Sequence, residues 1–490
     1  MTKDQTVDVD ISKHPRSDGL QKGVNGGRYY NSNGGTVNLT SAWYPDPEGT
    51  YWKFTHTPKG GRIGKINKGY SNLSTITEFN NNDKKSASVF YWGQDYNYGN
   101  PLLIQLGEGG SSVYYITDNG TSWSKQGEIS DSNLRKKLDE RNCKRNGAHI
   151  VDISQKGNSG YTPYTCPGCS DNQKIKVSYD NGYSPSDYSY YTPFTHGSIS
   201  FSVTSLKYND YWQAGLPSLK DVKSITVYWY KTGSANPIIV TQFQQGGNKW
   251  FRRNTRDGNT WIEVSNTNAL PSGTPPKLDL DLSKSSGITY FGGSTTGIGV
   301  AVRFCHIGDG YYRWQYSLKG GLFNVTRIRH ENTQLSDITP PSEKLLSVSA
   351  YYSGYDLGNT IGPLSNLILV EVVTSETGTN PKYLYYQKEN KDGTNWKELV
   401  RTEGGTGKQL VGEALKVLLV NLKEFKKTLS ELKDLKAKLE ELERLKTKSP
   451  ESSTTTIAGS SVGSGLGGAG LGALAMWKGP SLLARLITRM

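Results

Sequence analysis

The sequence of 490 residues is short of several residue types, and each shortage excludes a class of protein. Its four cysteines are too few to hold together a scaffold built on disulfides. Hydrophobic residues make up 34% of the chain, and this low fraction does not indicate a long buried helical core. Residues 1–10 are polar and contain no apolar run, so we expect no conventional signal peptide there.

Signatures of catalysis are missing as well, and the sequence contains no P-loop. The segment Gly459–Gly463 matches the letters of a nucleophile elbow, but it lies in low-complexity sequence with no strand before it. His330 and Glu331 lack the second histidine of a zinc-protease helix. His56 and His196 recur because a longer pattern recurs, which favours packed side chains over catalysts. We therefore predict no enzymatic activity, no cofactor and no catalytic metal.

Aromatic and turn-forming residues are abundant instead. The chain has 31 tyrosines and 56 glycines, together with many Trp, Thr, Ser and Asn residues. This mixture is typical of strands joined by tight turns. A disordered chain would be poor in aromatic residues, so we expect roughly the first 400 residues to be folded.

The most informative feature is a pattern that occurs three times. Each copy has an aromatic strand, an aliphatic strand, a second aromatic strand, a Gly turn and a tryptophan, in that order. The repeated aromatic residues are Tyr91, Tyr228 and Tyr351 in the first strand, and Trp123, Trp261 and Trp396 after the turn. An Asp-x-Ser triplet opens each copy, at residues 10–12, 152–154 and 281–283. His56 and His196 follow these openings, and His306 is the candidate for a degenerate third copy.

These repeats predict a mainly β protein with three tandem, antiparallel, β-sandwich-like modules. Asn-Gly and Asp-Gly turns between short apolar runs favour hairpins. At roughly 130 residues, each module is large enough to bury its own core. The predicted modules are residues 1–143, 144–275 and 276–405.

The repeated aromatic residues have two interpretations. They form either platforms on which glycans stack or the buried positions of strands that alternate between core and surface. We favour core positions for the tyrosines and tryptophans named above. The better binding candidates are the clustered tyrosines Tyr188, Tyr190 and Tyr191.

Three of the four cysteines, Cys143, Cys166 and Cys169, are close in sequence, while Cys305 is alone in its module. The Cys166-x-x-Cys169 motif fits half of a zinc site, a redox pair or a local disulfide. A second such motif is missing, and this one occurs in one module of three, which favours a structural disulfide or free thiols. We predict that Cys166 lies close to Cys143 or Cys169.

The composition changes after the third module, where residues 406–449 become rich in Leu, Lys and Glu. Leucines from Leu415 onward are three and four residues apart, a heptad-like stripe, until Leu432 and Leu435 break that rhythm. We predict one continuous amphipathic helix over residues 411–446, with few contacts to the modules. Its apolar stripe needs a partner, so we expect it to form a homo-oligomer.

The last segment, residues 450–490, contains a Ser/Thr linker and a Gly-rich tail. Residues 457–476 carry no charge over a length that spans a bilayer, although they are small and weakly apolar. Lys478 and Arg485 follow, and the positive-inside tendency would keep this basic end cytoplasmic. We predict a membrane-associated protein whose modules face outward at the cell surface. The alternatives are a tail that packs on a surface or on protein, and a secreted or intracellular chain.

The formal net charge of +13 also has two interpretations. It fits binding to nucleic acid, anionic membrane or acidic glycan, and it equally fits an ordinary soluble surface. The longest purely basic run is only Arg135–Lys137, and other basic residues are spread among acidic ones. We therefore expect no nucleic-acid partner.

Several of these features together resemble a known family. The tandem aromatic modules, the Leu-x-x-x-Leu helix that ends at Cys143, and the Gly-rich tail ending in Trp477–Pro480 resemble an expanded tandem-repeat family of piroplasm (Theileria and Babesia type) parasites. Its repeats are FAINT-like, and some members are labelled complement-component-like or CUB-like. The resemblance covers most of the chain. It implies a surface or exported protein that faces a host, and it implies no catalytic or ligand-binding residue.

Two functions then compete. The first is host interaction or adhesion by a membrane-tethered repeat protein, whose ligand is an unknown host protein or glycan. The second is a soluble secreted or intracellular scaffold that self-associates through the helix over residues 411–446. The resemblance favours the first function, and the leucine stripe favours self-association.

Overall fold

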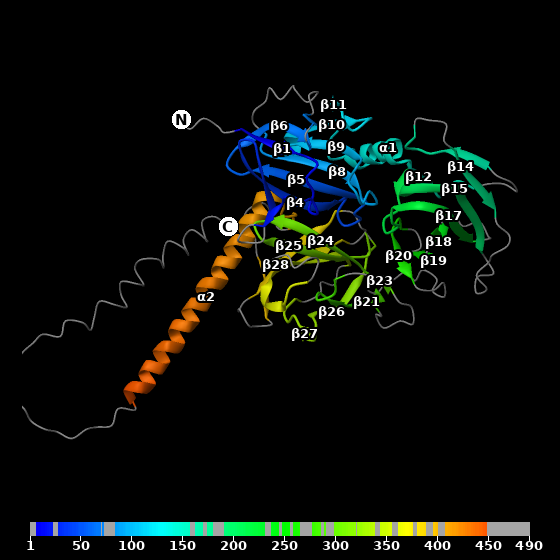
Figure 1. The fold of residues 1–490 in the computed structure, drawn as a ribbon. Helices are drawn as coiled ribbons and strands as arrows, with labels where there is room; N and C mark the ends of the chain where they lie inside the picture. The colour runs from blue at the N-terminus through cyan, green and yellow to red at the C-terminus, as the bar shows by residue number, and fades with distance from the viewer. Residues whose placement is uncertain are drawn as a thin grey trace, which may run out of the picture.

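A computed structural model of the chain is mainly β, with several antiparallel sheets (Figure 1). The sheets form a head of three regions, residues 6–126, 148–264 and 277–399, which we call the first, second and third regions. A helix, α2 (Gly412–Thr447), extends away from the head (Figure 1). The structure describes residues 6–22, 28–69, 71–72, 84–156, 162–169, 174–179, 191–230, 237–244, 247–254, 258–264, 277–285, 289–290, 298–319, 321–338, 344–354, 361–375, 380–388, 395–399 and 407–447.

The first region contains two sheets that share a core. A 3-stranded sheet has the order β1-β6-β7, and an 8-stranded sheet has the order β11-β10-β9-β8-β5-β4-β3-β2. Val7 and Val9 alternate with less buried neighbours along β1, and they pack in one cluster with Val89 and Ile104 of the larger sheet. The strands are β1 (Thr6–Asp10), β2 (Gln21–Lys22), β3 (Arg28–Ser32), β4 (Gly35–Tyr44), β5 (Tyr51–Pro58), β6 (Arg62–Lys68), β7 (Ser71–Asn72), β8 (Ala87–Trp92), β9 (Pro101–Leu106), β10 (Val113–Thr117) and β11 (Trp123–Gln126).

The third region has a similar plan. A 3-stranded sheet has the order β21-β26-β27, and a 6-stranded sheet has the order β24-β25-β28-β29-β30-β31. Leu278 and Leu280 of β21 share a core with Val348 and Val370 of the larger sheet. The strands are β21 (Lys277–Asp281), β24 (Ala301–Gly308), β25 (Tyr311–Ser317), β26 (Asn324–His330), β27 (Thr333–Gln334), β28 (Leu345–Ser353), β29 (Leu367–Thr374), β30 (Lys382–Lys388) and β31 (Trp396–Glu398).

The second region merges the two kinds of sheet into one 11-stranded sheet. Its long strand β15 (Tyr191–Tyr208) pairs antiparallel with β17 (Leu219–Tyr230) and, near its end, parallel with β12 (Ala148–Asp152). Two short strands from the third region extend this sheet, because Val264 of β20 pairs with Ile298 of β23. The other strands are β13 (Thr162–Thr165), β14 (Lys174–Tyr179), β16 (Tyr211–Trp212), β18 (Pro237–Gln244), β19 (Gly247–Arg253), β20 (Trp261–Val264), β22 (Thr289–Tyr290) and β23 (Ile298–Gly299).

The same local structure opens each region. An aspartate carboxylate accepts hydrogen bonds from the backbone N–H and the hydroxyl of the serine two positions later, which fixes a tight turn. The pairs are Asp10–Ser12, Asp152–Ser154 and Asp281–Ser283, with N···Oδ1 distances of 2.9, 3.0 and 3.0 Å. Each aspartate ends a strand that forms a parallel pair containing a β-bulge: β1 with β6, β12 with β15, and β21 with β26.

The structure pairs the repeated tyrosines differently from the sequence-based prediction, which aligned Tyr91 with Tyr351. Tyr91 lies in the core of the first region, and its hydroxyl donates to Ile11 O at 3.1 Å. In the third region Tyr352, not Tyr351, makes the equivalent bond, to Leu282 O at 3.2 Å. Tyr351 lies in a different cluster, on the other face of the sheet. The strand pairing is irregular at the same place in both regions, between Phe90 and Tyr91 and between Tyr351 and Tyr352. Tyr351 therefore corresponds to Phe90, and neighbouring residues of a strand face opposite sides of the sheet.

The expectation that His306 is the third copy of His56 is wrong. His56 lies on β5, which pairs with β8, and the strand in this place in the third region is β25, which pairs with β28. His306 lies on the preceding strand, β24. Trp52 pairs with Tyr91, and Tyr312 pairs with the equivalent Tyr352. His56 and Tyr316 each lie four residues further along the strand, so Tyr316 occupies the position of His56.

The regions pack directly against one another rather than hanging as separate units. Asp139 of the helix α1 (Leu134–Asn146) is fully buried between the first and second regions. Its carboxylate accepts hydrogen bonds from the hydroxyl of Tyr51 at 2.5 Å, the hydroxyl of Ser205 at 2.9 Å and the indole N–H of Trp212 at 2.8 Å.

The expected boundary between residues 143 and 144 falls inside α1, and residues 450–490 lie outside the described residues. Two short 3-10 helices complete the elements, η2 (Gly109–Ser111) and η3 (Leu364–Asn366).

Candidate functional sites

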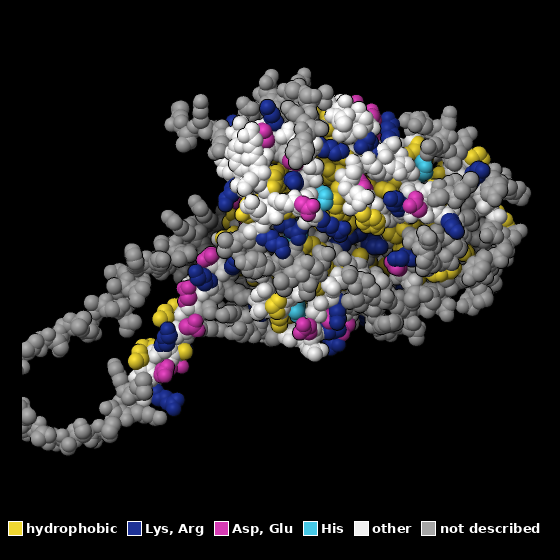
Figure 2. All heavy atoms as spheres, in the orientation of Figure 1, with side chains coloured by type: hydrophobic (Ala, Val, Ile, Leu, Met, Phe, Trp, Pro, Cys, Tyr) yellow, Lys and Arg dark blue, Asp and Glu magenta, His cyan; other side chains and the backbone are white. Residues whose placement is uncertain are grey.

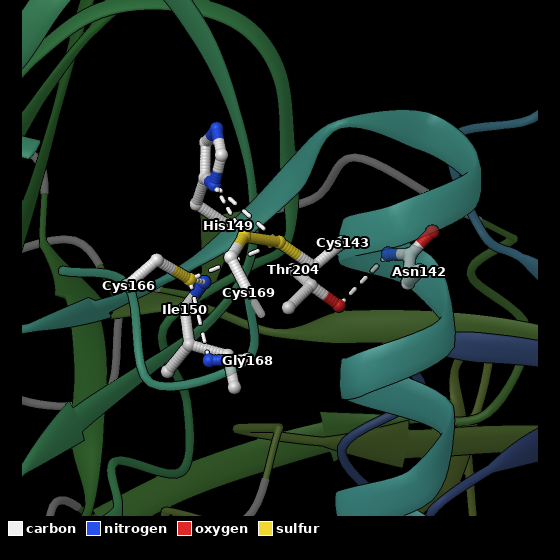
Figure 3. Close-up of a disulfide and its surroundings, with 8 residues drawn as sticks. All are labelled: Asn142, Cys143, His149, Ile150, Cys166, Gly168, Cys169 and Thr204. Carbon is white, nitrogen blue, oxygen red and sulfur yellow. Dashed lines mark hydrogen bonds between the residues drawn. A yellow bond between two sulfur atoms is a disulfide. The ribbon is translucent and has the colours of Figure 1, made fainter. Parts of the chain in front are cut away.

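Three cysteines and a histidine meet where α1 joins the second region (Figure 3). Cys143 is in the last turn of α1, His149 is in β12, and Cys166 and Cys169 flank the turn after β13. Gly147 ends α1 with a φ of 60°, a left-handed conformation that glycine adopts readily. The chain therefore reverses after the helix and brings His149 back beside Cys143.

The four side chains converge on one point, and we call them the Cys–His cluster. One ligand atom from each residue lies within 4.8 Å of the others. Cys143 and Cys169 form a disulfide. His149 Nδ1 lies 3.4 Å from Cys143 Sγ and 3.2 Å from Cys169 Sγ, and Cys166 Sγ lies 3.9 Å from Cys143 Sγ. Figure 3 shows one ring nitrogen and the three sulfur atoms facing one another.

Burial and backbone donors set the protonation of this cluster. Cys166 is a buried free thiol whose Sγ accepts hydrogen bonds from Ile150 N at 3.1 Å and Gly168 N at 3.4 Å. Burial raises the pKa of the Cys166 thiol, and these backbone donors lower it. Burial lowers the pKa of His149, which favours its neutral form. Neutral imidazole and cysteine thiolate are groups that bind zinc and softer divalent metals, and nearby N–H donors stabilise the charge of a thiolate.

The sequence indicates the cysteines of this cluster but not its histidine. The structure pairs Cys143 with Cys169 and places Cys166 beside Cys143. His149 is missed because its proximity to Cys143 depends on the left-handed turn that ends α1, and no second Cys-x-x-Cys motif marks it. The fourth cysteine, Cys305, is buried and free in the third region.

The repeated aromatic residues are core residues, as their alternation in strands favours. The tryptophans begin the strands β11, β20 and β31, and their exposed fractions are 5% for Trp123, 0% for Trp261 and 2% for Trp396. Tyr91, Tyr228 and Tyr351 are each 1% exposed, so none of the six offers a face to a glycan. Of the three clustered tyrosines, Tyr188 and Tyr190 lie outside the described residues, and the backbone of Tyr191 pairs with Tyr230 at the start of β15.

A cavity of about 130 Å³ lies where the three regions meet. Arg135 of α1 pairs with Glu48 through two N–H···O bonds of 2.8 and 2.6 Å at its wall. The Arg303 guanidinium lies 5.2 Å from the ring centre of Trp43, and Lys319 completes the basic lining. Figure 2 shows Lys and Arg side chains gathered on the face where the first and third regions meet.

More basic than acidic side chains line this cavity. Lys319 Nζ lies 4.0 Å from Glu263 Oε2, and burial lowers the pKa of Lys319 to about 8 while Glu263 opposes that shift. Burial also lowers the pKa of Arg303 to about 10, against the opposing carboxylates of Asp46 and Glu48. Taking cations out of water is unfavourable unless anions compensate them, so this cavity suits a small anionic group better than a cation.

The packed half of α2, residues 412–422, lies against the head. Leu415 and Leu419 are buried in one cluster with Tyr351 and Tyr385. Just before the helix, Leu410 N donates to the Tyr385 hydroxyl at 2.9 Å. The expectation of few contacts to the modules is therefore wrong for this half, because aromatic side chains on the outer face of the third sheet cover its leucines.

The exposed half of α2, residues 431–444, has no such cover within the described residues. Leu432, Leu435, Leu439 and Leu442 are 57%, 62%, 48% and 58% exposed. Their spacing of three, four and three positions places them on one helix face, as in a coiled-coil seam. The break in rhythm at Leu432 and Leu435 lies within this exposed half. Figure 2 shows hydrophobic side chains among charged ones along this half.

Within the part of the chain that the structure describes, no helix is both long enough and apolar enough to cross a membrane. The uncharged residues 457–476 lie outside that part. Comparisons with known proteins identify no relative: no family model, no curated protein and no solved structure matches this chain.

Proposed function

We propose that this chain is a non-enzymatic assembly protein, in which three tandem β-sandwich-like modules form the head and the exposed half of α2 joins two copies. The observation that carries this proposal is the stripe of four exposed leucines on one face of the described helix. Large apolar side chains in a row on a soluble surface mark an interaction site.

Helix stability supports a partner for this stripe. Most helical stability in proteins comes from packing an apolar face, and the four leucines of the exposed half have no such packing within the described residues. Burial of each leucine side chain contributes ~1.5–3 kcal/mol. Two copies that meet along Leu432, Leu435, Leu439 and Leu442 would therefore stabilise the exposed half of α2 and remove its apolar surface from water.

The leucine spacing fits a second copy of the same helix, in an antiparallel arrangement. The four leucines are placed symmetrically about Ala437, so in two antiparallel helices Leu432 meets Leu442 of the other copy and Leu435 meets Leu439. The same arrangement keeps the two heads at opposite ends of the pair, where they do not collide.

Light scattering on the full chain tests this proposal. We expect the wild type to have the mass of a dimer and the double variant Leu435→Lys, Leu439→Lys to have the mass of a monomer, because two buried cations on each helix disrupt the seam. The matched control is Ala437→Lys, which adds a charge between those positions on another face. A dimeric double variant, or a monomeric wild type at high concentration, would contradict the proposal.

A second function, host interaction at a cell surface, is favoured by the Cys143–Cys169 disulfide. Disulfides persist in oxidising compartments outside the cytosol, which fits the exported parasite family that the sequence resembles. In this proposal the head binds an unknown host protein or glycan, and residues 457–476 anchor the chain in the membrane. Biotinylation of lysines on intact cells tests it: labelling before permeabilisation supports the surface location, and labelling only afterwards contradicts it.

A further inference from the structure

We propose that the Cys–His cluster, when its cysteines are reduced, binds one zinc ion through Cys143, His149, Cys166 and Cys169. The four ligand atoms come from three different segments of the chain and still lie within 4.8 Å of one another. Three sulfurs and one imidazole nitrogen form one of the donor sets that structural zinc sites use. This inference is independent of the assembly proposed for α2.

The separations between these atoms fit a tetrahedral ion. Zn–S bonds of ~2.3 Å and Zn–N bonds of ~2.0 Å place ligand atoms about 3.8 Å apart for two sulfurs and about 3.5 Å apart for sulfur and nitrogen. The Cys143–Cys166 separation is 3.9 Å, and His149 Nδ1 lies 3.4 and 3.2 Å from the sulfurs of Cys143 and Cys169. Cys143 Sγ and Cys169 Sγ are bonded to each other, so reduction must let them move apart to the sulfur–sulfur separation given above before the site closes around an ion.

The surroundings of Cys166 also suit a metal-bound thiolate. Ile150 N and Gly168 N donate to its sulfur, and such outer donors orient a ligand and stabilise its charge. Cys169 N donates to Cys166 O at 3.1 Å, which closes the turn that points both sulfurs the same way. A Cβ at Gly168 would lie 2.8 Å from Ile150 Cδ1, so glycine lets this turn approach β12.

The proposed site is structural rather than catalytic, because four protein ligands leave no position open for water or substrate. It ties the end of α1 to β12 and to the turn after β13. Asp139, which bonds both the first and second regions, lies one helical turn before Cys143. Zinc would therefore fix the joint at which the second region meets the first.

Reduction must precede binding, and its chemistry balances with a small thiol as reductant. Two thiol molecules reduce the Cys143–Cys169 disulfide; they leave as one disulfide, and the protein gains two thiols. Zinc then displaces three protons, from Cys143, Cys166 and Cys169, to solvent, and binds His149 in its neutral form. The affinity should therefore fall as the pH is lowered.

Metal analysis of the full chain tests this site. The chain is purified with a phosphine reductant and zinc, dialysed, and analysed by mass spectrometry for metal. We expect one zinc ion per chain for the wild type and for the control Cys305→Ser, which removes the buried cysteine of the third region. We expect loss of the ion in Cys166→Ser and weaker binding in His149→Ala.

A second measurement keeps the test decisive if these variants fold poorly. The reduced wild type is titrated with Co²⁺, whose absorption reports tetrahedral thiolate ligation. A thiolate-to-cobalt band that zinc abolishes, together with a melting temperature raised by zinc, supports the site. Reduced wild type that binds neither metal, or that binds zinc equally well in Cys166→Ser, would overturn it. The mass of the assembly joined by α2 should be unchanged by either result.

Discussion

The two halves of α2 both carry leucines, but these leucines have opposite surroundings. In the packed half, Leu415 and Leu419 are covered by aromatic side chains of the third region, whereas Leu435 and Leu439 of the exposed half are open to solvent. The leucine rhythm breaks at Leu432 and Leu435, inside the exposed half. The same residue type thus serves the core of the head in one half and offers a surface in the other, because only the first half lies against the third region (Figure 1).

The largest expected loss of stability is that of a substitution in the core of the head, and it sets the scale for substitutions in the two halves of α2. Trp261 is fully buried, and its indole N–H donates to Gln213 Oε1 at 3.0 Å. We expect Trp261→Ala to lower the free energy of unfolding by ~3–5 kcal/mol, because it leaves a cavity. The control Tyr211→Ala removes a side chain that is 65% exposed and should change this free energy by less than ~0.5 kcal/mol. Urea unfolding measures both, and equal effects would show that burial of Trp261 does not stabilise the head.

The packed half of α2 should respond as part of the head. Leu419 is fully buried between the helix and the third sheet. We expect Leu419→Ala to cost ~2–5 kcal/mol in the free energy of unfolding, the range for truncation of a buried leucine. Unfolding followed by tyrosine fluorescence and by circular dichroism should shift together. An unchanged midpoint would mean that α2 does not dock on the head.

The head and the exposed half should also differ in their response to acid. Burial lowers the pKa of His56 from 6.5 to about 4, with Asp10 opposing the shift. As the pH falls, His56 is therefore protonated near pH 6.5 in the unfolded chain but only near pH 4 in the folded chain. The stability that His56 contributes is complete above pH 6.5 and falls by ~3 kcal/mol as the pH drops to 4.

Residues 431–444 contain no histidine, so their packing should lack this dependence. The free energy of unfolding of the wild type and of His56→Gln is measured between pH 7.5 and 4.5. The variant should lose less stability than the wild type over this interval. Parallel curves for the two proteins would contradict the assignment to His56.

The smallest expected effect is that of Leu439→Ala in the exposed half. Leu439 is 48% exposed, so its truncation should change the free energy of unfolding of the monomer by less than ~0.5 kcal/mol. The same change should weaken self-association, measured as a raised dissociation constant in sedimentation equilibrium. A large loss of monomer stability would show that this half packs on its own head.

Much of the repeat could be predicted because its markers are local. The Asp-x-Ser turn and the tryptophan after the Gly turn depend on a few neighbouring residues, and the structure shows them in equivalent places. The alignment of Tyr351 with Tyr91 failed by one position, because Tyr351 and Tyr352 are adjacent and the sequence alone does not say which of them faces the core. His149 was missed for a related reason, since its approach to Cys143 depends on a turn in three dimensions.

The contacts between regions were beyond the sequence for another reason. Modules that are large enough to bury their own cores are expected to fold without burying surface against one another. Yet Asp139 lies buried between two regions, and β23 of the third region joins the sheet of the second. Such contacts join residues far apart in the chain, and no periodicity encodes them. The leucine spacing of α2 did predict a helix, but only the structure separates leucines that pack on the head from those that face solvent.

Hydrogen exchange of the full chain at several protein concentrations tests the difference between the two halves most directly. Amides of residues 412–422 should exchange slowly at every concentration, because the head protects them. Amides of residues 431–444 should exchange quickly in dilute protein and progressively more slowly as concentration rises and copies pair. Exchange in residues 431–444 that is independent of concentration would contradict the assembly role of α2.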